Sequence, residues 1–218
     1  DAATYAIAQR MRGDIAGMGA VKTALSNGEA TVNVAITAGK AVADMLTEMK
    51  AKVVQANQAG LDTASRTALN NDFTSLRDQL ETIVKTAEFN GKNLITSAAT
   101  SLTVLSTVDG SSISVAAQKL DTTTLGINAS NISSGASAAL VAIDAAINTV
   151  TSSLASLGSS SKRIDVQAEF TVQLVDILKE GVGNLVDADL AEESAALQSL
   201  QIKQQLGVQA LSIANSGP

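Results

Sequence analysis

Apolar side chains recur every seven residues along the first part of the chain. The repeat comprises Met11, Met18, Leu25, Val32, Leu46 and Val53. A companion position holds Ala8, Ile15, Ile36 and Ala43, but Lys22, Glu29 and Lys50 interrupt it. Apolar residues at this spacing share one face of an α-helix. The pattern predicts a long amphipathic helix over about residues 1–57, with a seam that is partly polar.

Three further helices are expected. Asp62 or Thr63 caps a helix whose apolar positions, from Leu69 to Ala87, alternate steps of four and three. Consecutive heptads predict a third helix over 137–180, which Gly181-Val182-Gly183 is expected to end. A last helix then runs from about 189 to 214. Asp189 is predicted to be its N-cap, with Glu192 as the reciprocal partner.

The segment Phe89-Asn90-Gly91 separates the helical pattern from a different one. Asn and Gly tolerate the left-handed backbone of a tight turn, so we expect this structural turn to reverse the chain, with Phe89 anchoring the last helical turn in the core. Residues 102–117 then alternate apolar and polar side chains around Asp109-Gly110, which predicts a β-hairpin. Residues 121–135 are rich in Thr, Asn, Ser and Gly and are expected to form an exposed loop.

These elements predict a mainly α fold: an elongated, rod-like bundle of long antiparallel helices with a β-hairpin at one end. Residues 1–92 would supply the N-terminal helices of the core, and residues 93–135 the hairpin and a variable loop. Residues 136–218 would return as the C-terminal helices.

Composition argues against an enzyme. The chain has no His and no Cys, which excludes a Ser-His-Asp triad, a Cys nucleophile and an ordinary zinc site. The carboxylates around Asp187 and Asp189 match no calcium loop, and the Ser159–Lys162 spacing has no companion motif. We therefore predict no catalytic, cofactor-binding or metal-binding residue, and no cofactor.

Charge and hydropathy limit the partners. A net charge of -6 provides no basic excess for nucleic acid. No run of 18 apolar residues is evident, so membrane insertion is not expected. The chain begins without Met and enters a helical pattern at once, which suggests a piece of something longer.

The last predicted helix is apolar on more than one side. Its glutamines are interspersed with Leu197, Leu200, Ile202, Leu206, Leu211 and Ile213. An isolated helix would not expose such a surface, so this helix is expected to have partners, either in its own chain or in neighbouring subunits.

Four segments together resemble bacterial flagellin, the subunit of the flagellar filament. They are Asp1-Ala2-Ala3 through Ala8, Phe89 through Leu94, Leu154 through Ile164, and Leu185 through Asn215. The resemblance brackets the chain, and residues 97–135 carry little of it. It implies an extracellular protein of the bacterial flagellum, exported without a cleaved signal peptide, that polymerises with itself for motility. It also implies an export chaperone and cap or hook-associated proteins as partners, and a core fragment lacking both polymerising termini.

Two alternatives remain open at this point. A hook–filament junction protein shares the same helical core, although the segment from Gln205 to Asn215 favours flagellin. A cell-surface flagellin homologue that binds a polysaccharide is the other alternative, with Lys40, Lys50 and Lys52 as its candidate basic patch. A glycan could also be attached to exposed Ser or Thr side chains of the loop.

Overall fold

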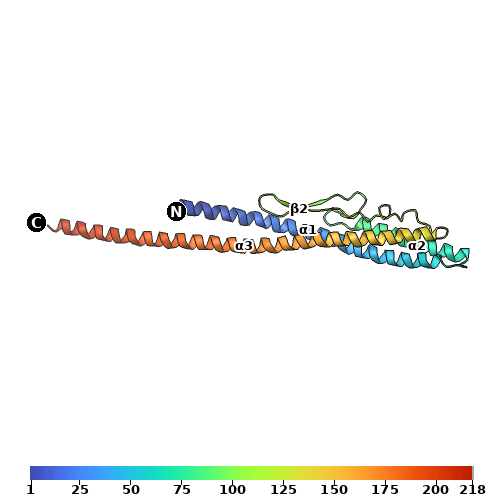
Figure 1. Cartoon of the computed structure of the whole chain (residues 1–218). Helices are drawn as coiled ribbons and strands as arrows, with labels where there is room; N and C mark the ends of the chain where they lie inside the picture. Colours follow the sequence, from blue (N-terminus) through green and yellow to red (C-terminus); the bar gives the residue numbers. More distant parts are fainter. Residues whose placement is uncertain (218) are drawn as a thin grey trace. The chain divides into compact units, whose positions relative to one another are not determined.

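The structure is a computed structural model that describes residues 1–217. In this range it contains three helices and one antiparallel pair of strands, in chain order α1 (Ala2–Ala56), α2 (Thr63–Thr86), β1 (Leu102–Leu105), β2 (Ser112–Val115) and α3 (Ala136–Asn215) (Figure 1). The predicted class, mainly α with a small β excursion, is confirmed. The chain divides into two units, one of residues 1–20 with residues from 170 onward, the other of residues 21–169. Each unit draws on both α1 and α3.

The larger unit, residues 21–169, is built around the seven-residue repeat of α1. Leu25, Val32, Leu46 and Val53 are fully buried, as their spacing predicts. The companion line, however, is a different one from that predicted. It consists of the buried residues Val21, Ala35, Val42, Met49 and Ala56, whereas Ile36 and Ala43 are only partly buried. The reason is that Lys22, Glu29 and Lys50 share the predicted line, which therefore lies at the edge of the core, where charged side chains can still reach water.

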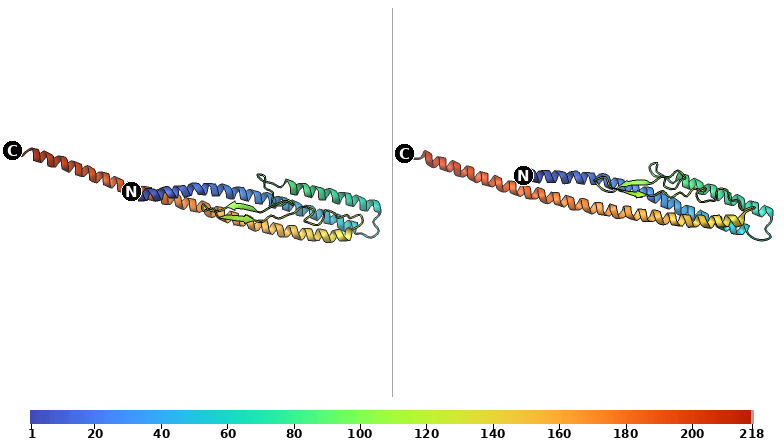
Figure 2. Two further views of the ribbon diagram at one scale, coloured as in Figure 1. Left: turned by 90° about the horizontal axis from the view of Figure 1, so that it is seen from above. Right: turned by 45° about the horizontal axis from the view of Figure 1, so that its top comes forward.

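In this unit α1 and α3 run antiparallel and side by side, as both views of Figure 2 show. Polar contacts fix their register. Asn57 Oδ1 accepts a hydrogen bond from Ser137 Oγ at 3.2 Å, and Lys50 Nζ lies 2.7 Å from Asp144 Oδ1. Seven residues separate these two contacts on each helix, so the helices meet in a regular ladder with heptad steps.

The β-hairpin packs on the core through one face. Leu102 pairs with Val115 and Val104 with Ile113, in antiparallel register. Val104, Ile113 and Val115 are buried, whereas Thr103 and Ser114 are exposed, so the alternation read from the sequence is that of a half-buried sheet. Gly110 adopts φ 94° at the turn between the strands.

Residues 121–135 differ from the expected exposed loop. They contain no strand or helix, but Leu125, Ile127 and Ile132 are buried in the core of this unit. Three polar side chains of α2 hold the main chain of this segment in place. Asn70 Oδ1 accepts a hydrogen bond from Ile132 N at 2.9 Å, and Arg77 donates to the carbonyl of Ser130 at 3.1 Å. Glu81 Oε2 accepts from both N and Oγ1 of Thr122, each at 2.9 Å.

In the smaller unit, α3 continues through Gly181-Val182-Gly183 without a break, so the predicted helix end at these residues is wrong. A helical glycine costs only about 1 kcal/mol relative to Ala, which packing can offset. At Gly181 the helix runs close to α1, because a Cβ there would lie 3.0 Å from Cε of Met11, the flexible end of that side chain. Ala8, Thr171 and Val175 are buried in the same unit.

The continuous helix also corrects the predicted cap. Asp189 and Glu192 lie inside α3, where main-chain amides already bond within the helix and need no cap. Asp189 instead accepts a hydrogen bond through Oδ1 from the Asp1 main-chain nitrogen, at 2.8 Å.

Candidate assembly surface

The predicted structural turn lies between α2 and the hairpin. Phe89 and Lys92 form an isolated antiparallel bridge, in which each main-chain N–H donates to the other residue's carbonyl at 3.0 Å. Between them, Asn90 has φ 51° and Gly91 has φ 78°. Two successive left-handed residues are typical of a two-residue hairpin turn and explain why Asn-Gly stands here. The turn reverses the chain over four residues.

Phe89 does not occupy the place expected for it. α2 ends at Thr86, so Phe89 lies beyond the last helical turn, and its side chain is only half-buried. Together with Leu102 and Val104 it borders a shallow pocket next to Ala24 and Thr31 of α1. The buried residues of α2 are Phe73, Leu80 and Val84, which anchor that helix in place of Phe89.

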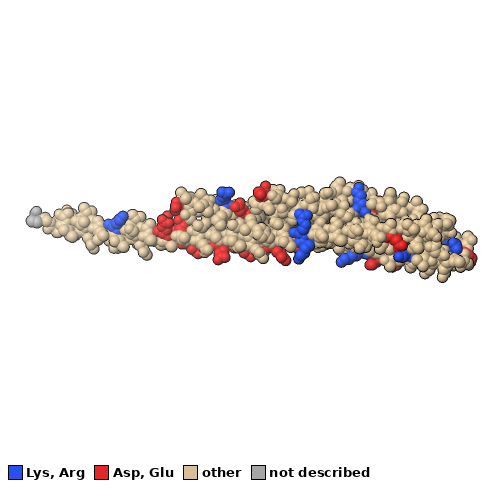
Figure 3. All heavy atoms as spheres, in the orientation of Figure 1, with Lys and Arg blue, Asp and Glu red and all other residues tan. Residues whose placement is uncertain are grey.

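The last part of α3 is the least covered segment of the structure. From residue 191 to residue 217 every residue is exposed. Leu211 and Ile213 retain 70% and 73% of their accessible surface, values unusual for such large apolar side chains. Lys203 is the one charged residue between Glu193 and the chain end, and Figure 3 shows this segment almost without red or blue. The apolar side chains read from the sequence are thus left uncovered by the described part of the chain.

The exposed apolar side chains form two stripes on this helix. At 3.6 residues per turn, the two stripes lie on nearly opposite sides. Stripe A consists of Leu190, Leu197, Leu200, Val208 and Leu211, and stripe B consists of Ile202, Leu206 and Ile213. A helix of this kind can be covered only by neighbours on two sides.

Two family models match the chain at its two ends. The model described as "Bacterial flagellin N-terminal helical region" matches residues 1–100, and "Bacterial flagellin C-terminal helical region" matches residues 140–218. Flagellin FljK of Caulobacter vibrioides is 47% identical over 216 residues, which cover 98% of this chain and 79% of that protein. The chain belongs to the bacterial flagellin family. It is therefore a structural subunit of the flagellar filament, the part of the flagellum outside the cell.

More distant proteins match over two thirds of the chain or nearly all of it. Flagellin C of Rhizobium meliloti is 33% identical, and the match covers 99% of this chain and 84% of that protein. Among solved structures, Bacillus cereus flagellin matches with a TM-score of 0.61 at 19% identity, over 66% of this chain and 86% of that one. A putative flagellar hook-associated protein from Vibrio parahaemolyticus matches with a TM-score of 0.68 at 15% identity, covering 84% and 98%. At these identities the two structures show a shared fold.

The lysines considered for a polysaccharide patch do not act together in this flagellin. Lys50 pairs with Asp144, and Lys52 Nζ lies 2.9 Å from Asp72 Oδ2. Two of the three positive charges are thus paired locally, and Lys40 is the remaining exposed lysine.

The carboxylates of the smaller unit do not form an ion site either. Asp187, Glu192 and Glu193 are exposed. Nowhere in residues 1–217 do three or more carboxylates come together in an arrangement able to hold a metal ion.

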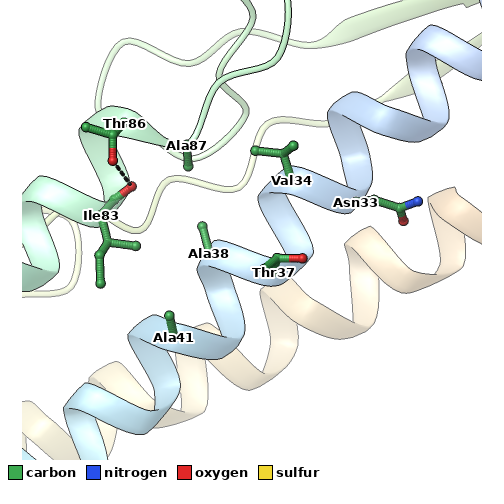
Figure 4. Close-up of a pocket in the computed structure, with 8 residues that line it drawn as sticks. All are labelled: Asn33, Val34, Thr37, Ala38, Ala41, Ile83, Thr86 and Ala87. Carbon is green, nitrogen blue, oxygen red and sulfur yellow. Dashed lines mark hydrogen bonds between the residues drawn. The ribbon is translucent and has the colours of Figure 1, made fainter.

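A shallow groove between α1 and the end of α2 is mostly apolar. Figure 4 shows Val34 and Ala38 of α1 facing Ile83 and Ala87 across it. Its polar lining consists of Asn33, Thr37 and Thr86, none of which is charged. Nothing in this lining selects a particular ligand.

By length and composition, α3 would also pass as a helix able to cross a membrane, contrary to the sequence-based expectation that no segment is apolar enough. Core helices of soluble proteins pass the same test. In a flagellin, the same apolar surface is available for contacts with other subunits.

Proposed function

We propose that this flagellin polymerises with itself into the helical filament used for motility, and that the two stripes of α3 are its principal contact surface. The observation that carries the proposal is the placement of stripe A and stripe B on nearly opposite sides of one exposed helix. A closed pair of subunits would cover one stripe and leave the other in water. Repeated head-to-tail contacts cover both, as a non-closing assembly requires.

The energy available from the stripes is large. Burying a Leu or Ile side chain stabilises an interface by about 1.5–3 kcal/mol. Several such side chains therefore supply enough free energy to offset the loss of translational and rotational freedom on association. Glutamines between the stripes, such as Gln201 and Gln205, provide hydrogen-bonding groups without a net charge to desolvate.

The test uses the full-length protein with one substitution in each stripe. We expect Leu200→Ser in stripe A and Leu206→Ser in stripe B each to reduce the polymerised fraction, measured by sedimentation and electron microscopy. Lys203→Ser is the matched control, because Lys203 lies on the same helix between the stripes and is equally exposed. It should polymerise as the unchanged protein does.

Normal filaments from both Leu variants would overturn the proposal. Circular dichroism of the unpolymerised variants should show the helix content of the unchanged protein, since all three side chains are already exposed in the subunit. A loss of polymerisation with unchanged helix content assigns the effect to the subunit contacts.

The same proposal includes export without a cleaved signal peptide, an export chaperone, and contacts with cap and hook-associated proteins, with a glycan as a possible modification. Membership of the flagellin family supports it. Mass spectrometry of protein sheared from filaments tests whether a leader peptide is removed on export. If the measured mass is smaller than the gene encodes by the mass of an N-terminal leader, export without cleavage is wrong.

A further inference from the structure

The ladder between α1 and α3 brings two carboxyl groups together in the larger unit. Ser161 Oγ donates a hydrogen bond to Asn33 Oδ1 at 3.5 Å, so these two residues face each other across the two helices. We call such a facing pair a rung of the ladder. Glu29 precedes Asn33 by one helical turn, and Asp165 follows Ser161 by one turn. In antiparallel helices the next rung is therefore Glu29 opposite Asp165.

The position of this rung makes its chemistry unusual. Glu29 lies three heptads before Lys50 along α1, and Asp165 lies three heptads after Asp144 along α3, so the two rungs are equivalent in the ladder. The Lys50–Asp144 rung is an ion pair at 2.7 Å. At the Glu29–Asp165 rung two like charges meet instead, and both side chains are partly buried.

Two ionised carboxylates that face each other on one rung repel, whereas a protonated carboxyl group can donate a hydrogen bond to a carboxylate. Burial raises the pKa of Glu29, and the hydrogen bond with Asp165 and the charge of Asp165 raise it further. All three effects favour a bound proton on the pair in the folded chain.

We propose that Glu29 and Asp165 share one proton and form a latch between α1 and α3 that holds more tightly in acid than at neutral pH. The charged residues closest in sequence to the pair are Lys22 on α1 and Lys162, Arg163 and Glu169 on α3. All four are exposed, and within residues 1–217 none forms an ion pair with Glu29 or Asp165. The β-hairpin, which packs on α1 in the same unit, carries Asp109 at its exposed tip, and Lys119 lies in the segment after the hairpin.

The direction of the pH effect follows from proton binding. A carboxyl whose pKa is raised on folding binds its proton more tightly in the folded state than in the unfolded state. Its contribution is fully favourable below the unfolded value, near pH 4.3, and is lost as pH rises through the raised value. Above that value the latch carries the repulsion of two charges.

The experiment compares thermal unfolding of the chain from pH 4 to pH 8 with that of Glu29→Gln. The amide of Gln can donate to Asp165 at any pH, so the variant keeps the hydrogen bond and removes the titration. We expect a Tm about 2–4 °C higher for the variant at pH 8. A chain of this length shows such a shift when one substitution changes its unfolding free energy by about 1 kcal/mol. The difference should shrink or vanish at pH 4.

Asp144→Asn is the matched control, because it removes a carboxylate from the equivalent rung where the partner is Lys50. It should lower Tm slightly or leave it unchanged, and the shift should not become positive at pH 8. NMR titration of the Glu29 carboxyl carbon in the unchanged chain supplies a second readout, with a midpoint above that of an exposed Glu such as Glu48. Parallel Tm curves for Glu29→Gln and the unchanged chain, or a Glu29 midpoint at or below that of Glu48, would overturn the proposal.

Discussion

Val104 of β1 packs directly over Gly28 of α1. A Cβ built on Gly28 would lie 2.6 Å from Cγ2 and 2.9 Å from Cγ1 of Val104, closer than real side chains approach. The hairpin thus sits on the helix at a point where only glycine leaves room. A glycine weakens a helix by about 1 kcal/mol relative to Ala, but Gly28 sets how closely the sheet approaches α1.

Gly28→Ala should destabilise the larger unit. Val104 is β-branched and lies in a strand, so its side chain cannot rotate away from the new methyl group without strain. Overpacking of this kind costs about 1–3 kcal/mol, which exceeds the gain of about 1 kcal/mol from replacing a helical glycine. Urea unfolding measures the difference.

Two other helical glycines serve as controls for this prediction. At Gly39 the nearest atom to an added Cβ is Leu154 Cδ2, the flexible end of a side chain, so Gly39→Ala should cost less. Nothing lies within 4 Å of an added Cβ at Gly158, so Gly158→Ala should stabilise by about 0.5–1 kcal/mol. Equal effects at all three sites would contradict the packing argument.

Gly91→Val should damage the turn at residues 89–92. Gly91 has φ 78°, where a β-branched residue is strained, so we expect a loss of about 1–3 kcal/mol in unfolding free energy. Polymerisation of the full-length variant should also fall. Asn90→Gly, at the neighbouring left-handed position, should be nearly neutral, and unchanged stability of Gly91→Val would show that the turn is not required.

The N-cap of α2 predicts an acid-sensitive helix end. Asp62 Oδ1 accepts a hydrogen bond from Ser65 N at 2.8 Å, and hydrogen bonds from the side chain and main chain of Ser65 lower the pKa of Asp62. A lowered pKa stabilises the fold above the unfolded value, near pH 4, and this contribution is lost as pH falls through the folded value. Amide exchange at Ser65 should therefore accelerate, relative to a mid-helix amide of α2, as pH falls from 5 to 3. Asp62→Asn should remove that pH dependence while keeping the cap.

Glu81 should be required to hold the segment after the hairpin. Its carboxylate accepts two hydrogen bonds from Thr122, which is itself buried. Glu81→Ala leaves the buried Thr122 amide without its acceptor, at a cost of about 1–3 kcal/mol. Glu81→Gln retains an acceptor and should cost less. Urea unfolding of both variants checks the order, and an equal loss in both would assign the effect to charge.

The sequence predicted the buried face of α1 where a single seven-residue repeat of apolar residues runs along it. The spacing from Leu25 to Val53 correctly identified buried positions, because a heptad line must face a partner over its whole length. The second line was misassigned, since small residues such as Ala35 fill the closest contacts and carry little hydrophobic signal. The glycines at 181 and 183 misled for a related reason. Their helix cost is local and visible in the sequence, whereas the contact of Gly181 with Met11 joins distant parts of the chain.

The burial of residues 121–135 could not be predicted, because the composition of a segment does not show which distant residues bind its main chain. The main chain of this segment forms hydrogen bonds with Asn70, Arg77 and Glu81, which lie far away in sequence on α2.

The assembly surface on α3, in contrast, could be predicted from the sequence. A helix apolar on two sides, with a single charge in its last part, is visible in the residues of 190–217 themselves.

The regular ladder between α1 and α3 limits how the length of this protein can change. A single residue inserted into one of the two helices would rotate everything beyond it by about 100° and separate Lys50 from Asp144 or Glu29 from Asp165. Seven residues added to α1 and seven to α3, at facing positions, would restore every rung. Extra length in this part of the subunit is therefore tolerated only as matched blocks on both helices.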